Sequence, residues 1–171
     1  MSLPVVPEDN DISPMVAQML AIPLGRILCL DYGERRMGVA LSDPNQVIAS
    51  PNTTLAAKDT RATVAELLKM VQDFHVVAIV IGWPLHMNGS AGERTEAVDR
   101  FLQVMQDSIT VPVFSWDERW STISAHRALR EQGVSPSKNK QRVDAVAAAI
   151  VLESFLQRLH HLRRTHQPTQ S

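Results

Sequence analysis

The chain has 171 residues, a formal net charge of −1 at pH 7 and a single cysteine. This length suits one domain with a substantial core, and the small net charge excludes a global basic field for binding nucleic acid. One cysteine also excludes intrachain disulfides and zinc sites built from several thiolates. Because neither a signal peptide nor a membrane-spanning apolar run is visible, we expect a cytoplasmic protein with no membrane partner.

The two ends of the chain differ in composition from its middle. Residues 1–24 carry four prolines and an acidic cluster, so we expect a partly flexible extension with a helical turn between Pro14 and Leu24. The main domain is expected at 25–160. Residues 161–171 lose helical periodicity and are expected to form a C-terminal tail that frays.

The stretch RILCLDYGERRMGVALSD, from Arg26 to Asp43, holds the first unusual residue. An apolar run ends abruptly in Asp31, a glycine turn follows, and apolar residues then alternate with small or polar ones. This pattern predicts two strands paired as a hairpin over 27–42. A third, short strand at 47–55 contains Pro51 and is expected at a sheet edge. A buried carboxylate is unfavourable unless it is paired, so Asp31 requires a cation or hydrogen-bond donors.

From residue 59 onward, helical patterns alternate with short apolar strands. Asp59 predicts a helix N-cap, and the β-branched run VVAIVI predicts a strand buried on both faces, as in a parallel sheet. We expect the other elements as a helix from about residue 90, a strand at 111–116, a helix at 121–132 and a buried helix at 141–163. This order predicts an α/β fold with a mixed five-stranded sheet, three antiparallel strands followed by parallel strands, flanked by helices.

Acidic residues interrupt an apolar context at two further places, one after a strand and one in the last helix. Asp117 and Glu118 follow a strand, at the kind of strand end where sites assemble in parallel sheets. Asp144 is the only ionisable residue in the apolar first half of the last helix. Local explanations remain open: either acid at the strand end can pair with Arg119, and Asp144 can pair with Arg142 or favour its own helix start.

Taken together, Asp31, Glu118 and Asp144 predict a metal site. Carboxylates without thiols or clustered imidazoles favour hard cations, so we expect Mg²⁺ or Mn²⁺. Two such ions are the usual device for activating water in phosphodiester hydrolysis. Residues 119–142 carry six cations against one acid, which indicates a phosphate-binding surface or simply a solvated face. The expected nucleic-acid contacts are Arg35, Arg36, Arg119, Lys138, Lys140 and Arg142.

Four motifs carry a family resemblance: DYGERRMGVALSD, GWPLHMNGSAGE, DERWST and RVDAVAAAIVLESFL. In order and spacing they resemble the YqgF family, also called RuvX, over about residues 26–157. The resemblance implies an RNase H-like fold related to RuvC resolvases, and a nuclease that processes the 5′ end of precursor 16S rRNA. It implies Asp31, Glu118 and Asp144 as metal-binding catalytic residues. Glu34 and Asn88 depart from residues common in the family.

The expected function is therefore a metal-dependent nuclease acting on structured RNA, with Tyr32 and Asn88 as possible substrate contacts. Association with a ribosome precursor is possible, and the chain is expected to be a monomer or homodimer. One alternative is Holliday-junction resolution in DNA recombination and repair, and another is a non-catalytic nucleic-acid-binding module. A phosphotransferase of the actin and sugar-kinase type would need a second lobe, for which 171 residues are too few.

Overall fold

A computed structural model describes residues 13–33, 35–83, 92–117 and 140–167. Its strands form one sheet in the order β3-β2-β1-β4-β5. The strands are β1 (Arg26–Asp31), β2 (Arg36–Ser42), β3 (Ala49–Ala56), β4 (Val76–Trp83) and β5 (Val113–Asp117). The first three strands are antiparallel, whereas β4 pairs in parallel with both β1 and β5. The predicted mixed sheet is confirmed.

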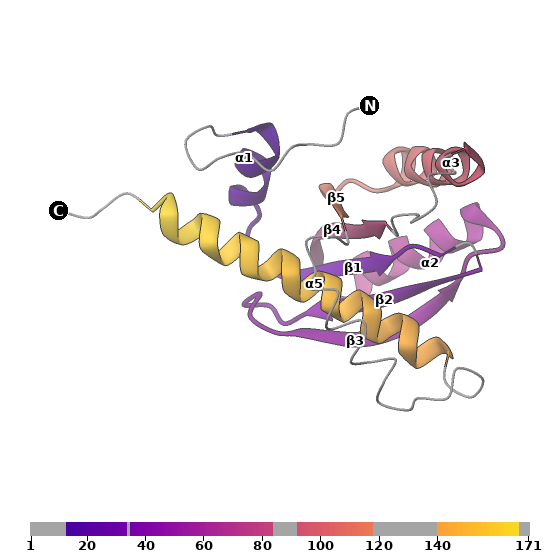
Figure 1. Ribbon diagram of the computed structural model, residues 1–171, viewed down its shortest axis with the longest axis horizontal. Helices are drawn as coiled ribbons and strands as arrows, with labels where there is room; N and C mark the ends of the chain where they lie inside the picture. The colour runs from indigo at the N-terminus through magenta and orange to yellow at the C-terminus, as the bar shows by residue number, and fades with distance from the viewer. Residues whose placement is uncertain (1–12, 34, 84–91, 118–139, 168–171) are drawn as a thin grey trace.

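Helices cover both faces of this sheet (Figure 1). One face carries α1 (Pro14–Leu20) and α5 (Lys140–Thr165), and the other carries α2 (Thr60–Asp73) and α3 (Gly92–Ser108). No helix in the described ranges is both long and apolar enough to cross a membrane. The predicted N-cap Asp59 is confirmed, since its carboxylate accepts hydrogen bonds from the first amides of α2.

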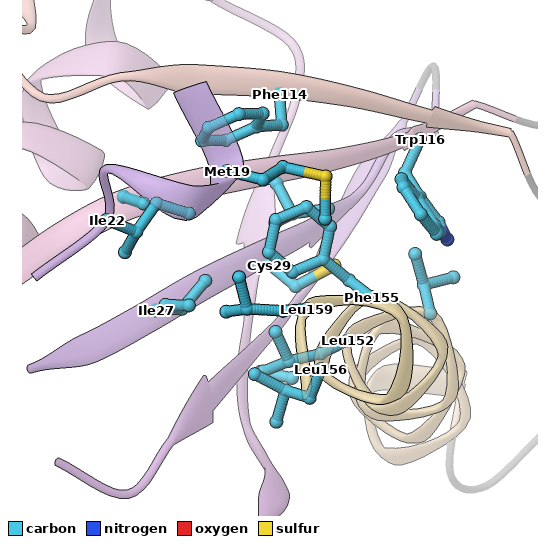
Figure 2. Close-up of a cluster of buried hydrophobic side chains, with 14 of the residues drawn as sticks. Met19, Ile22, Ile27, Cys29, Phe114, Trp116, Leu152, Phe155, Leu156 and Leu159 are labelled. Atoms are coloured by element: carbon cyan, nitrogen blue, oxygen red, sulfur yellow. The ribbon is translucent and has the colours of Figure 1, made fainter. Parts of the chain in front are cut away.

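The alternation of residues along β1 sends its side chains into two separate cores. Ile27 and Cys29 pack on the α5 side, whereas Leu28 and Leu30 pack on the α2 and α3 side. The α5-side core is closed by aromatic residues from β5 and by Phe155 of α5, as Figure 2 shows. The central strand is therefore buried on both faces, as its unbroken apolar run indicated.

The edge position of β3 follows from Pro51. The β2–β3 register shifts between Val39 and Ala40, which pair with Thr53 and Pro51 respectively. A proline cannot donate to the ladder, so it is accommodated where the strand bulges at the edge of a sheet.

The last helix ends close to the predicted residue 163, at Thr165. We also expected the chain to fray from residue 161, but residues 161–165 are helical. Leu162 is buried in the α5-side core, and this burial stabilises the final turn. The expected helical turn near Pro14 is confirmed as α1, in which Val16 and Met19 pack into the same core.

A buried polar cluster, which we call the Gln46 network, joins three segments near the end of α5. Gln46 is fully buried, and its Nε2 donates to the carbonyl oxygens of Pro23 and Gly25. Its Oε1 accepts a 2.8 Å hydrogen bond from Arg163, which also donates to the carbonyl of Ile22 at 3.0 Å. Burial lowers the pKa of Arg163 from its ordinary value. The guanidinium nevertheless stays charged, because its ordinary pKa lies far above neutral pH.

Arg163→Leu is expected to lower the free energy of unfolding by about 2 kcal/mol, because it leaves buried oxygens of Gln46 and Ile22 without their donor. Urea denaturation measures the change. Arg164→Leu is the matched control at an exposed neighbouring position and should change stability by less than about 0.5 kcal/mol. Equal effects of the two substitutions would contradict a stabilising role for the Gln46 network.

Asp43 stabilises the turn between β2 and β3. Its carboxylate accepts amide hydrogen bonds from Ile48, Val47 and Asn45 at 2.7, 2.8 and 3.1 Å. These bonds, with that from Ile48 the strongest, lower the pKa of Asp43. Because the folded pKa lies below the unfolded value near 3.9, the stabilisation is complete above that value and is lost as the pH falls through the folded pKa.

Asp43→Ala is expected to lower the free energy of unfolding by about 1 kcal/mol at pH 7, because exposed hydrogen bonds contribute little net energy. The difference from the wild type should shrink below about pH 4, as the wild-type carboxyl becomes protonated. Urea denaturation at pH 7 and pH 3 checks this. A difference of the same size at both pH values would show that the charge plays no part.

Candidate active site

Asp31 lies at the end of β1, in a row of residues that crosses the sheet. Its neighbours are Gly38 of β2 and Gly82 of β4, and the row continues to Thr54 of β3 and Trp116 of β5. Cross-strand neighbours share one face of a sheet. That face is the α5 side, because Trp116 packs against α5 and because Cys29, two residues before Asp31, belongs to the same core.

The two glycines beside Asp31 let α5 lie close to the sheet. A Cβ atom at Gly38 would collide with the backbone oxygen of Asp144, and one at Gly82 would lie 3.0 Å from a methyl carbon of Val151. Neither glycine has a positive φ, so both are required for space rather than for backbone conformation. Although Gly38 lies in the β1–β2 hairpin, it serves the packing of α5 rather than the turn, because the backbone of Asp144 lies against it.

This contact brings two predicted ligands together. Asp31 is the cross-strand neighbour of Gly38, and the backbone of Asp144 lies against that glycine on the same face of the sheet. The elements that carry the two acids are thus held at one place by a close backbone contact. The role of this pair as metal ligands stays a prediction.

Asp144 has a partner that the sequence did not indicate. Its Oδ2 lies 3.0 Å from Nε of Arg36, although we expected Arg36 on phosphate and considered Arg142 as the local partner of Asp144. The two atoms are buried and attract through charge without the alignment of a hydrogen bond. The rest of each side chain reaches solvent, with 39% of Arg36 and 29% of Asp144 exposed.

A sequence signal for this pair existed. In β2, Arg36 and Gly38 alternate with the buried residues Met37 and Val39, so they share the face opposite to those apolar side chains. Because Arg36 and Gly38 lie two residues apart on the face that α5 covers, the part of α5 that packs on Gly38 also lies near Arg36. What the sequence could not show is that α5 passes over this glycine at Asp144.

The residues present fit a divalent cation. Asp31 and Asp144 supply carboxylate oxygens, the donors that Mg²⁺ and Mn²⁺ prefer. The buried Oδ2 of Asp144 lies 3.0 Å from the positively charged guanidinium of Arg36, so the surroundings of this oxygen are compatible with a positive charge. Within the described ranges no group of three or more His, Cys, Asp or Glu residues gathers. The third predicted ligand, Glu118, lies outside the described residues, directly after the end of β5.

The predicted substrate contacts have mixed outcomes. Arg35 and Arg142 are exposed, as a phosphate contact requires, and Lys140 is the first residue of α5. Tyr32 is not placed to stack on a base, because its ring is 7% exposed and packs edge-on against Phe101 with centroids 5.6 Å apart. The predicted contacts Arg119, Lys138 and Asn88 lie outside the described residues.

Residues 25–158 match the family described as RuvX, Holliday junction resolvase. The chain belongs to the RuvX family. Among its relatives, a protein of Roseiflexus sp. (strain RS-1) named "Putative pre-16S rRNA nuclease" is 41% identical over 132 residues, covering 77% of this chain and 94% of the relative. A protein of the same name from Chloroflexus aurantiacus is 39% identical over 142 residues, covering 82% and 93%.

A solved structure shares the fold of this RuvX protein. T. thermophilus RuvC in complex with a Holliday junction substrate aligns with a TM-score of 0.53, at 15% identity, covering 79% of this chain and 96% of RuvC. The RNase H-like architecture implied by the four motifs is thereby supported. The family is one of nucleases, and the two acids that the fold brings together belong to its motifs.

Proposed function

We propose that this protein is a divalent-metal-dependent nuclease that processes the 5′ end of precursor 16S rRNA in the cytoplasm. The observation that supports the proposal is the contact of the Asp144 backbone with Gly38, the cross-strand neighbour of Asp31. The RuvX family match and the names of relatives at about 40% identity support nuclease activity and this substrate.

In this proposal, Asp31, Asp144 and Glu118 hold Mg²⁺ or Mn²⁺. When bound, the cation would stabilise charge on the phosphate and lower the pKa of a bound water. The residues around Asp31 hold this proposed ligand in place. Asp31 is fixed by ladder pairing on both sides, and Gly38 and Gly82, which lack side chains, let α5 pack close beside it.

Exposed cations complete the proposed surface. Arg35 follows the end of β1, and Arg142 lies in the first turn of α5, so both border the acids. They can neutralise backbone phosphates without reading sequence. This arrangement suits a substrate that is selected by its shape, as structured RNA is.

A cleavage assay tests the proposal. Precursor 16S rRNA that retains its 5′ leader is incubated with the protein in Mn²⁺ and, separately, in EDTA. Release of the leader in Mn²⁺ alone is the expected result. Binding of the RNA without cleavage under every metal condition would favour a non-catalytic module instead.

A second candidate is resolution of Holliday junctions. It is favoured by the description of the RuvX family and by the fold shared with RuvC. A four-way DNA junction assayed beside the RNA separates the two functions. Symmetric cleavage of the junction, with the RNA left intact, would replace our proposal.

A further inference from the structure

We propose that Arg36 is a placeholder cation for the metal site: it neutralises Asp144 until a divalent ion binds, and its guanidinium then moves to a substrate phosphate. This inference rests on the proposed function and concerns the order in which ion and substrate enter the site. It assigns to one arginine a role in neutralising Asp144 before the ion binds and a role in binding the substrate.

The first argument is competition for one carboxylate. The guanidinium Nε lies 3.0 Å from Oδ2 of Asp144. A Mg²⁺ or Mn²⁺ ligated by the same carboxylate would be bound directly to its oxygen, closer than the guanidinium is. Two positive charges would then be only a few ångströms apart, and each would weaken the binding of the other. A bound ion therefore favours departure of the guanidinium.

The second argument is that the pair is easily separated. Its contact lacks hydrogen-bond alignment, so separation gives up Coulomb attraction but no well-formed hydrogen bond. With 39% of its side chain exposed, Arg36 has a direct path to solvent. Its backbone remains fixed, because Arg36 pairs with Ala56 in β3 and the preceding carbonyl accepts from Ala57 at 2.9 Å. Only the flexible side chain needs to move.

The third argument is the chemistry of the released group. A guanidinium presents several donors in a planar fork that matches two phosphate oxygens. Arg36 starts β2, and 39% of its side chain reaches solvent, so the released guanidinium is accessible to a substrate phosphate. The guanidinium that leaves Asp144 can therefore bind the phosphate whose hydrolysis we propose.

Shared use of Arg36 couples the two ligands. The metal frees the arginine for phosphate, and the phosphate holds the arginine away from Asp144. Each ligand should therefore tighten the binding of the other by the same factor. Without Arg36, the site at Asp144 would bind the ion more tightly but would lose this dependence on substrate.

The experiment measures Mn²⁺ binding by isothermal titration and by electron paramagnetic resonance of free Mn²⁺, without nucleic acid. Arg36→Gln should bind Mn²⁺ about tenfold more tightly than the wild type, because a nearby positive charge is removed. Arg36→Lys keeps the charge and should stay within about threefold of the wild type. Arg35→Gln removes an exposed neighbouring charge and should have an effect of less than about threefold.

A second titration contains a hairpin RNA with phosphorothioate linkages, which resists hydrolysis. The RNA should tighten Mn²⁺ binding to the wild type, and Arg36→Gln should show less of this gain. Circular dichroism in EDTA checks folding, and Arg36→Met, which keeps the apolar stem, replaces the glutamine variant if that variant unfolds.

Weaker Mn²⁺ binding by the Arg36 variants would overturn the inference, because it would show that the arginine orients Asp144 for the ion. Unchanged binding would overturn it as well, because it would show that ion and arginine do not compete. The proposed function fails separately if the wild type binds no Mn²⁺, or if binding survives both Asp31→Asn and Asp144→Asn.

Discussion

Asp31→Asn is expected to lower the rate of precursor cleavage about 10³-fold, the upper range for loss of one electrostatic contributor to a transition state. The substitution keeps the size of the side chain but removes the charge that holds a cation. The backbone of residue 31 is fixed by pairing to Gly38 and Gly82, so the variant should fold. Cleavage rates in Mn²⁺ at pH 7 measure the effect.

The control is Asp73→Asn, which makes the same chemical change at an exposed position at the end of α2. It should cleave at the wild-type rate. Mn²⁺ titration of Asp31→Asn should show weaker binding in parallel with the lost activity. Cleavage by Asp31→Asn at the wild-type rate would disprove the assignment of Asp31 as a catalytic residue.

Gly38→Ala should lower the free energy of unfolding by about 3 kcal/mol, at the upper end of the range for overpacking a buried site. The added methyl group would meet the backbone oxygen of Asp144 and the amide of Ala145, and a helix backbone cannot rotate away as a side chain can. α5 must then move off the sheet and carry Asp144 with it. Urea denaturation measures the stability, and Mn²⁺ titration measures the damage to the site.

Gly82→Ala is the matched control on the other side of Asp31. Its methyl group would lie 3.0 and 3.2 Å from side-chain carbons of Val151 and at an ordinary 3.6 Å from the backbone oxygen of Leu30, so a small adjustment of Val151 relieves the contact. We expect a loss of about 1 kcal/mol or less. If the two alanine variants were equally stable, the tight approach of Asp144 to Gly38 would be disproved.

Much of the fold could be predicted because local patterns decide it. The apolar run before Asp31 identified a buried strand, Pro51 indicated an edge strand, and Asp59 identified the start of a helix. Asp31 and Asp144 were both recognised because a carboxylate in an apolar context is unfavourable without a partner. Each of these inferences needs only neighbouring residues.

The remaining features depend on how α5 crosses the sheet. The contact between Gly38 and Asp144, and the ion pair between Arg36 and Asp144, join residues more than 100 positions apart. The fraying expected for residues 161–165 is wrong for a related reason, since these residues belong to α5. The last turn of α5 is held by Leu162 in the core and by Arg163 in the Gln46 network, and neither partner lies nearby in the sequence.

The Gln46 network has a consequence at the opposite end of the molecule. An apolar helix on an apolar sheet can slide by one turn with little loss of burial, whereas the hydrogen bonds of Arg163 are satisfied at one axial position only. Asp144 lies about 28 Å from Arg163 along the same helix, at 1.5 Å per residue. The position of Arg163 in the Gln46 network therefore helps to fix the position of Asp144 along the sheet. If α5 shifted by one turn, the Asp144 carboxylate would be displaced by about 5 Å relative to Asp31.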